Sequence, residues 1–394
     1  METVSAVNMR SAAEPGEAMQ SLAVRVHAGE AGLARLAASG TRPLTPFQRV
    51  EWLAAYLTAT GETDAFRLVE IETPRGAVLL PLEISRFGPF RVADITGGKQ
   101  ASFHGVAIRG EPAFSAGQLK QALREAGRTL NLDALIITDA PQIWRSEDHP
   151  LAILPRQPSP SSGWAVTLES ECETLFARLS NREDRKKQRY KANKLAQIGP
   201  VTAGWITEDA ARRASIEQLF IWKAERFGNV GIDNPFAEPA MQEFLRNASG
   251  GPDAPIHIFG LWAGERLVAV MVCAREGWAC SGMVNANDQD PDITKTSPGE
   301  QLLSHLLRTL CAEGAKQFDL GVGEARYKAH FCPEPVPLFD AGLAVNLRGQ
   351  IATRLFFAMR GLKRGVKQNE RLWSLVTRYR KWKAGQAASS ARPG

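Results

Sequence analysis

The sequence is short of the patterns that build disulfide frameworks, zinc sites and membrane spans. Its 394 residues include five cysteines, an odd number with no C-x-x-C pair, which argues against disulfides and structural zinc. The six histidines do not cluster, and neither H-E-x-x-H nor G-x-S-x-G occurs, so we expect no metal and no serine-hydrolase site. No run approaches the roughly 18 apolar residues of a membrane-spanning helix, and residues 1–20 lack the apolar part of a signal peptide. We therefore expect a folded cytoplasmic protein.

The chain does contain enough apolar material for one large core or two smaller ones, since 44% of its residues are hydrophobic. Glycine and proline, at 34 and 23 residues, are near average usage, which excludes collagen-like and wholly disordered chains. The net charge of +6 is unevenly spread, because residues 348–394 carry twelve basic residues and a single acid, Glu370. The rest of the chain is mildly acidic.

The patterning of the chain predicts two similar units of mixed α/β structure. Residues 66–87 are typical of a β-hairpin, 116–130 of an amphipathic helix and 134–140 of a buried strand. The same order returns between residues 256 and 323, with three β-runs, a leucine-rich helix and a strand. This repeat indicates an internal duplication, although α/β proteins of this size often show such an order by chance.

We divide the chain into five segments: a disordered lead (1–20), an N-terminal unit (21–156), a Pro- and Ser-rich linker (157–163), a C-terminal unit (164–347) and a basic amphipathic helix with a polar tail (348–394). Within the C-terminal unit, we expect 170–227 to be helical. In the last segment, 351–383 interleaves apolar residues with cations. It either closes the domain as a helix or lies on an anionic membrane surface or a partner.

The sequence TSPGEQLL (296–303) predicts a helix N-terminus with exposed backbone amides. Ser297 is the expected cap, Pro298 needs no N–H at the first helical position, and Glu300 completes a capping box. Gly299 leaves the amides unobstructed. Such a helix start favours an anion such as phosphate. A well-capped helix without a ligand explains the same residues.

A second candidate is FDLGVGEARYKAHF (318–331), because α/β sheets bind ligands where their strands end. The segment holds two carboxylates, a phenol and an ammonium within ten positions: Asp319, Glu324, Tyr327 and Lys328. Shielded from water, Tyr327 and Lys328 could donate a proton or orient an acyl oxygen. The alternative is a solvated loop with a packed tyrosine ring.

Two further segments carry charge or aromatic surface. Residues 182–194 hold seven basic side chains, which form either a solvated helix face or a site for nucleotide phosphate, an acidic substrate or RNA. In LFIWKAERFG (219–228), Trp222 and Arg226 stand at helical spacing and are candidate substrate contacts. Core packing with a salt bridge explains this segment equally well.

Together these sequences resemble the Gcn5-related N-acetyltransferase (GNAT) superfamily, and within it the cellulose-biosynthesis acetyltransferase branch (CelD/BcsL-like). The resemblance runs from about residue 41 to 340, through TPFQRVEWL, NREDRKKQRYKANKLAQIG, LFIWKAERFG, TSPGEQLL and FDLGVGEARYKAHF. The chain is also similar to FemAB-type transferases, which carry two such units in tandem. The resemblance implies an α/β (α+β) fold of two tandem GNAT-like units, each a mixed, mostly antiparallel sheet flanked by helices.

The resemblance also implies a function. The protein would transfer an acyl group, most simply acetyl, from acetyl-CoA to an amine or hydroxyl of a small molecule or saccharide, in exopolysaccharide or cell-envelope synthesis. Pantetheine would lie along a splayed strand, with its pyrophosphate on the following helix start. The implied cofactor-binding residues are Val284, Asn285, Ser297, Pro298, Gly299, Gln301 and Leu302. No metal is implied.

For catalysis, Tyr327 matches the superfamily's usual general acid, which protonates the leaving thiolate. Asp319 or Glu324 would accept the proton of the attacking amine. Lys328 would hold a carboxylate or phosphate of the acceptor.

Two alternatives stay open, since the superfamily's Q/R-x-x-G-x-G/A loop is absent. One is a FemAB-like transfer from aminoacyl-tRNA, less favoured than acyl-CoA, in which 182–194 would bind the RNA and binding would fall steeply with salt. The other is a non-catalytic accessory protein of polysaccharide synthesis, docked at the inner membrane face through 351–383.

Overall fold

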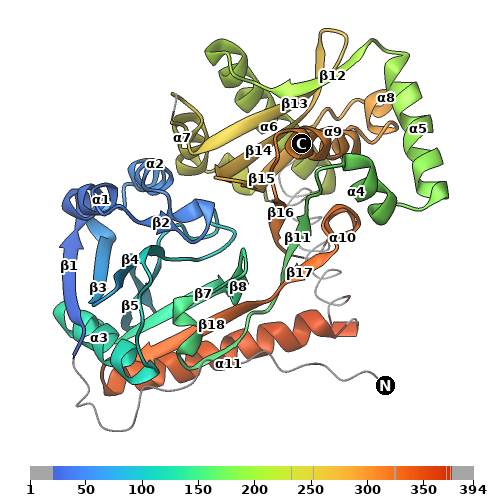
Figure 1. Ribbon diagram of the computed structural model, residues 1–394. Coiled ribbons are helices and arrows are strands. Elements are labelled where there is room, and N and C mark those ends of the chain that lie inside the picture. Colours follow the sequence, from blue (N-terminus) through green and yellow to red (C-terminus); the bar gives the residue numbers. More distant parts are fainter. Residues whose placement is uncertain are drawn as a thin grey trace, which may run out of the picture.

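The computed structural model describes residues 21–374 except positions 232, 252, 324, 370 and 373. Two large β-sheets lie next to each other, helices pack against the faces of both, and β8 and β9 form a separate two-stranded sheet (Figure 1). The elements of the first part of the chain are β1 (Ala23–Ala28), α1 (Gly29–Ala37), β2 (Arg42–Pro43), α2 (Val50–Thr60), β3 (Phe66–Thr73), β4 (Gly76–Phe87), β5 (Phe90–Ile95), β6 (Ala107–Gly110), α3 (Ala116–Thr129), β7 (Ala134–Pro141), β8 (Ile143–Trp144), β9 (Glu147–Asp148) and β10 (Arg156–Pro158). The later elements are β11 (Gly163–Thr167), α4 (Cys172–Leu179), α5 (Arg182–Ala196), β12 (Val201–Trp205), α6 (Asp209–Val230), α7 (Pro239–Ala248), β13 (Ile256–Ala263), β14 (Arg266–Glu276), β15 (Ala279–Asn287), α8 (Pro291–Thr294), α9 (Pro298–Ala312), β16 (Gln317–Val322), α10 (Arg326–Phe331), β17 (Glu334–Val336), β18 (Leu338–Ala344) and α11 (Leu347–Gln368). The expected lead, 1–20, lies outside the described residues.

Both sheets are mixed and mostly antiparallel, which confirms the expected fold class. The main path of the first sheet is β1-β3-β4-β5-β7-β18-β10, and that of the second is β12-β13-β14-β15-β16-β11-β17. In the first sheet β5 pairs in parallel with β7, and in the second β15 pairs in parallel with β16. Three antiparallel strands, a helix and a parallel strand therefore occur in both sheets, in the order of the predicted repeat.

The chain crosses between the sheets at two places, between β10 and β11 and between β17 and β18. β10 pairs with β18 in the first sheet, whereas β11 pairs with β16 and β17 in the second. Residues 338–344, which we expected in the C-terminal unit, therefore complete the N-terminal sheet beside β7. The segment 170–227 also differs from the expectation of helix throughout, because residues 201–205 pair with β13 as the edge strand β12.

One hydrophobic core continues from the first unit into the second. α2 packs against α7, where the rings of Trp52 and Tyr56 lie 5.1 and 6.0 Å from that of Phe244. The opposite face of the second sheet is covered by α9, which buries a stripe of leucines: Leu302, Leu303, Leu306, Leu307 and Leu310. The apolar face that the sequence predicts for this helix thus fixes α9 on the sheet.

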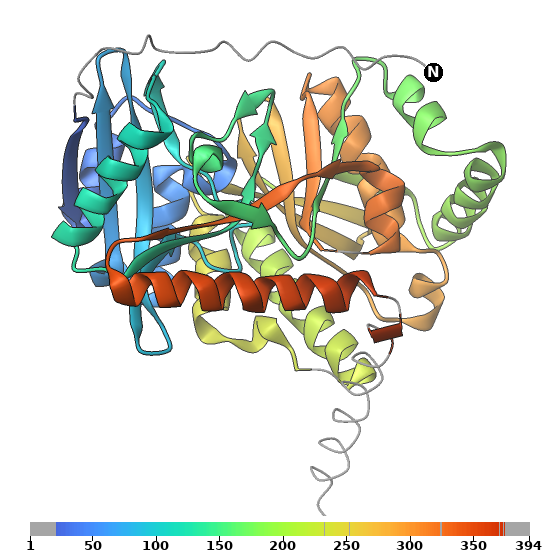
Figure 2. The same cartoon turned by 90° about the horizontal axis from the view of Figure 1, so that it is seen from below.

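The helix α11 lies across the outer face of the first sheet (Figure 2). Ala352 and Phe356 are buried there against strands β5 and β7. None of the described helices combines the length and the apolar character needed to span a membrane.

Candidate functional site

The strands β15 and β16 separate part-way along their length. Their parallel register covers residues 279–281 of β15 and 317–319 of β16, and it ends at the pair Ser281 and Asp319. β15 continues to Asn287, still paired with β14 on its other side. The second half of β15 therefore borders a gap in the middle of the sheet.

Asp319 ties the two strands together where they begin to separate. Its side chain is 1% exposed and accepts hydrogen bonds from Ser281 Oγ at 2.5 Å and from the Gly321 amide at 2.9 Å. Burial raises the pKa of Asp319 to about 7, against the effect of these hydrogen bonds. We expected this carboxylate to accept a proton from the substrate, but the structure places it inside the sheet.

A cavity of about 480 Å³, which we call the main cavity, is lined by α6, β15, the start of α9 and α10. Six residues that the sequence singled out as site candidates line it: Arg226, Asn285, Ser297, Pro298, Gly299 and Tyr327. The rest of the lining is Lys223, Phe227, Val230, Asn287, Thr294, Glu300 and Leu303. The structure thus brings together residues that lie up to 104 positions apart in the chain.

The first turn of α9 forms one wall of the main cavity, without the expected capping box. Ser297 is left-handed, with φ 52° and ψ 59°, and its side chain makes no capping hydrogen bond within the described chain. A capping box needs an extended cap residue, and the Glu300 carboxylate instead pairs with Lys191 Nζ at 2.8 Å. A Cβ added to Gly299 would have Asn287 Oδ1 as its nearest neighbour, at 3.9 Å, so this wall is open.

Tyr327 lies on α10 and borders the main cavity. Burial raises the pKa of Tyr327, and the nearby Arg226 guanidinium offsets part of that rise. The phenol is therefore protonated at neutral pH, as a proton donor must be. Lys328 is outside the lining, and its Nζ donates to the Val322 carbonyl at 2.9 Å, which joins α10 to the end of β16. Glu324 lies outside the described residues.

The other expected site residues are in the protein interior. Val284, Leu302 and Trp222 are buried in the hydrophobic cores. Gln301 is also buried, and its side-chain amide donates to the Thr296 carbonyl at 2.9 Å. Their apolar side chains, and the internal hydrogen bond of Gln301, explain why they pack inward.

Lys223 lines the main cavity, and the sequence analysis did not identify it. Its side chain is 8% exposed, and its Nζ lies 4.7 Å from the ring centroid of Phe236. Burial, with a contribution from Arg226, lowers the pKa of Lys223 to about 8. A buried lysine of this kind can accept a proton near neutral pH. The one signal in the sequence was its spacing from Arg226, since residues three apart share a helix face.

A comparison with known families identifies the part of the chain that holds the main cavity. Residues 182–329 match a family model described as an acetyltransferase (GNAT) domain. This range includes every lining residue of the main cavity. Residues 182–329 are therefore similar in sequence to GNAT domains. No curated protein sequence matches the chain.

The matches to solved structures extend beyond residues 182–329. FemX is 10% identical with a TM-score of 0.53, over 82% of this chain and 97% of FemX. L-PGS from Bacillus licheniformis is 15% identical with a TM-score of 0.46, over 78% and 96% of the two chains. A tandem GNAT protein from the clavulanic acid biosynthesis pathway is 12% identical with a TM-score of 0.40, over 83% and 99%. At this identity, the likeness to FemX shows a common fold.

Proposed function

We propose that this protein transfers an acyl group, most simply acetyl, from a coenzyme A thioester to an amine or hydroxyl acceptor. The observation that carries the proposal is the main cavity, in which Tyr327, Lys223 and the first turn of α9 line one space beside the separated strands β15 and β16. The match of residues 182–329 to a GNAT domain supports the same class of reaction.

In our proposal the two titratable side chains of the cavity move the protons of acyl transfer. Neutral Lys223 takes the proton of the acceptor as its nitrogen or oxygen attacks the thioester carbonyl. The C–S bond then breaks, and Tyr327 protonates the departing thiolate, which leaves as the free thiol. The proton on Lys223 finally returns to the tyrosinate through water. The lowered pKa of Lys223 suits a proton acceptor near neutral pH, and the raised pKa of Tyr327 keeps its phenol protonated until the thiolate departs.

The start of α9 is the natural place for the polar part of the donor in this scheme. The positive end of a helix dipole favours negative charge. Ser297, Pro298 and Gly299 present this end to the cavity. Asn285, on the free half of β15, lies on the same cavity and can bond an amide of the donor.

The acceptor in our proposal is a small molecule or a saccharide-linked amine or hydroxyl. Arg226, an exposed cation on the cavity wall, favours an acceptor that carries a negative charge. The CelD/BcsL-like branch and the link to exopolysaccharide or cell-envelope synthesis rest on the sequence resemblance alone.

A second candidate donor is an aminoacyl-tRNA, and the surface of α5 favours it. Of the seven basic residues on α5, Arg182, Lys186, Lys187 and Arg189 are exposed, and the first, second and fourth of these share one helix face that an extended anion could contact. One of these, Lys187, pairs with Glu183 on the same helix at 2.8 Å. We favour the CoA thioester because the main cavity accounts for the transfer without contacts from Arg182, Lys186 or Lys187.

The donor is tested by calorimetry and thermal shift with acetyl-CoA, longer acyl-CoAs and free CoA. Ligand present at about 100 times its Kd stabilises the folded protein by about 2.7 kcal/mol, which raises the Tm. Transfer is followed as the release of CoA thiol with amino sugars and simple amines as acceptors. If no thioester raises the Tm while aminoacyl-tRNA binds with an affinity that falls about 10³-fold between about 50 and 200 mM salt, the donor is tRNA.

We also propose that α11 holds the protein on an anionic membrane surface, at the inner face. Five apolar side chains on α11 are between 48% and 78% exposed: Leu347, Ile351, Leu355, Met359 and Leu362. The helix carries six cations and no acid, and ion pairs with the first sheet engage two of them, Arg348 and Arg360. Apolar side chains flanked by cations are typical of helices that lie in the headgroup region. Residues 375–383 of the expected membrane segment lie outside the described residues.

A further inference from the structure

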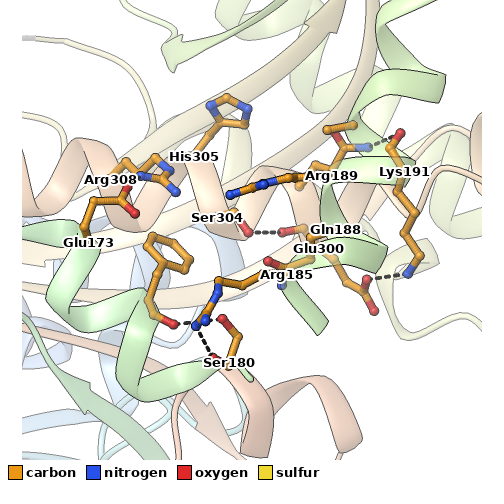
Figure 3. Close-up of a pocket in the computed structure, with 13 residues that line it drawn as sticks. Glu173, Ser180, Arg185, Gln188, Arg189, Lys191, Glu300, Ser304, His305 and Arg308 are labelled. Carbon is orange, nitrogen blue, oxygen red and sulfur yellow. Dashed lines mark hydrogen bonds and ion pairs between the residues drawn. The ribbon is translucent and has the colours of Figure 1, made fainter. Parts of the chain in front are cut away.

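A second cavity, of about 230 Å³, lies between α5, the end of α4 and the outer side of α9 (Figure 3). We call it the α5–α9 cavity. Most of its lining residues have polar side chains, and the lining comprises Glu173, Phe176, Ser180, Arg185, Gln188, Arg189, Lys191, Ala192, Glu300, Gln301, Ser304, His305 and Arg308. Glu300 lines this cavity and the main cavity, so the first turn of α9 separates the two.

The cations of the α5–α9 cavity outnumber its carboxylates. Four basic side chains line it, against two acids. Each acid is already engaged, since Glu173 pairs with Arg308, and Glu300 pairs with Lys191 at 2.8 Å. Each of these two ion pairs offsets one positive charge with one negative charge. Two positive charges are left over.

The surplus charges are those of Arg185 and Arg189 on α5. Arg185 donates from Nη1 to the Ser180 carbonyl at 2.6 Å, a neutral partner that leaves its charge uncompensated. Arg189 has neither an ion pair nor a hydrogen bond among the described residues, and Figure 3 shows its guanidinium extending from α5 into the space beside α9. Guanidinium groups around one hollow repel each other unless an anion lies between them, and arginine matches phosphate in geometry and charge.

The opposite wall holds its groups in fixed positions. The Arg308 guanidinium stacks on the Phe176 ring, 4.4 Å from the centroid. Burial and the neighbouring Arg308 lower the pKa of His305, which is therefore neutral at pH 7 and can offer one N–H without adding charge. This wall thus supplies a hydrogen-bond donor, His305, that needs little rearrangement to meet an anion.

We infer that the α5–α9 cavity binds a phosphate group of the acyl donor, with Arg189 as its principal contact. The inference rests on the proposed function, because it extends the donor past the first turn of α9. The cavity is smaller than the roughly 300–1,000 Å³ of sites that enclose a whole drug-sized ligand. It therefore accepts a phosphate or diphosphate group and leaves the remainder of the donor outside.

The test compares Arg189→Ala with Lys186→Ala by calorimetry. Both substitutions remove one positive charge from α5, but Lys186 is exposed and outside the cavity lining. We expect Arg189→Ala to weaken the binding of acetyl-CoA about tenfold, as the loss of a charge-assisted hydrogen bond does. Binding of S-acetylpantetheine, which lacks the nucleotide phosphates, should stay unchanged. Lys186→Ala should leave the affinity for both ligands close to wild type.

An equal loss of acetyl-CoA affinity in the two variants, or an equal loss of S-acetylpantetheine affinity in Arg189→Ala, would overturn the inference and leave the proposed acyl transfer standing. Inorganic pyrophosphate, which carries phosphate groups but no thioester, tests the anion site separately from the acyl donor. If wild type binds pyrophosphate and Arg189→Ala does not, while no thioester binds, the anion site stands and the CoA donor fails. Melting curves of both variants show whether either fold is disturbed.

Discussion

Replacing Lys223 by methionine separates the chemistry of the main cavity from its contribution to stability. Lys223→Met keeps the volume of the side chain and removes the amine that we propose as proton acceptor. Burial and Arg226 lower the pKa of Lys223 from 10.5 to about 8, a change that corresponds to about 3 kcal/mol. Because the folded state disfavours the charged amine, this cost is complete below pH 8 and disappears as the pH rises toward 10.5.

At pH 7 we therefore expect Lys223→Met to raise the free energy of unfolding by about 2 kcal/mol, once about 1 kcal/mol is subtracted for the lost contact with the Phe236 ring. The same substitution should lower kcat by about 10²–10⁴-fold and remove the rise of kcat/KM with pH near 8. Chemical denaturation and initial rates over a pH series measure the two effects. Lys186→Met, on an exposed face of α5, is the control and should show neither. A variant that keeps wild-type turnover and pH profile would refute our assignment of Lys223.

The pKa of Lys223 can also be measured without any assay of transfer. Competitive labelling of amines with acetic anhydride, read by mass spectrometry of the peptide, should give half-maximal reactivity of Lys223 near pH 8. Arg226→Gln should move this midpoint upward, because the neighbouring guanidinium is one of the two causes of the lowered pKa. A midpoint near 10.5 in the wild type would show that the amine is solvated.

Three further predictions concern the rest of the molecule. Tyr327→Phe should lower kcat by about 10²-fold while the Kd of acetyl-CoA changes by less than about twofold, and unchanged turnover would remove Tyr327 from the site. Burial raises the pKa of Asp319 from 3.8 to about 7. The free-energy cost of ionising this carboxylate in the folded protein therefore grows as the pH rises from 3.8 to about 7. Asp319→Asn should then raise the free energy of unfolding by up to about 4 kcal/mol at pH 8 and by nothing at pH 4, and equal effects would contradict this. Ile351→Glu combined with Met359→Glu should abolish sedimentation with phosphatidylglycerol vesicles at unchanged Tm, whereas Ile221→Glu, at 50% exposure on α6, should not.

Much of the fold follows from local patterns in the sequence. The hairpin β13–β14 turns at Gly264, whose φ of +63° suits glycine, and the leucine stripe of α9 predicted both the helix and its buried face. No local pattern predicts that the chain leaves the second sheet after β17 and joins the first sheet at β18. This crossing depends on pairing with β11 and β7, which lie far away in the chain.

The candidate site was harder to predict because burial decides what each polar side chain does. Asp319 and Lys223 are both ionisable, yet one is sealed between strands and the other is held against Phe236 at the cavity wall. Ser297 is a residue type that favours helix caps, but its left-handed backbone prevents that role. Each outcome depends on neighbours from distant parts of the chain, which residue types and spacing do not specify.

The first unit has the same strand separation as the second, but side chains bridge it. β5 and β7 pair in parallel over two residues and then part. Asp94 accepts the amide and the hydroxyl of Thr138 across the separation, at 3.1 and 2.6 Å. Beside it, Arg360 of α11 pairs with Asp139 at 2.6 Å and with Asp340 at 2.5 Å.

This difference predicts how many donors one chain binds. The space of about 320 Å³ left beside the first separation is covered by α11, and its described lining contains no tyrosine. The second unit keeps its separation open and places Tyr327 and Lys223 on it. Calorimetric titration with acetyl-CoA should therefore give one site per chain, and Arg360→Ala should not create another. A stoichiometry of two would show that the first unit binds the donor as well, and that the bridging side chains do not close it.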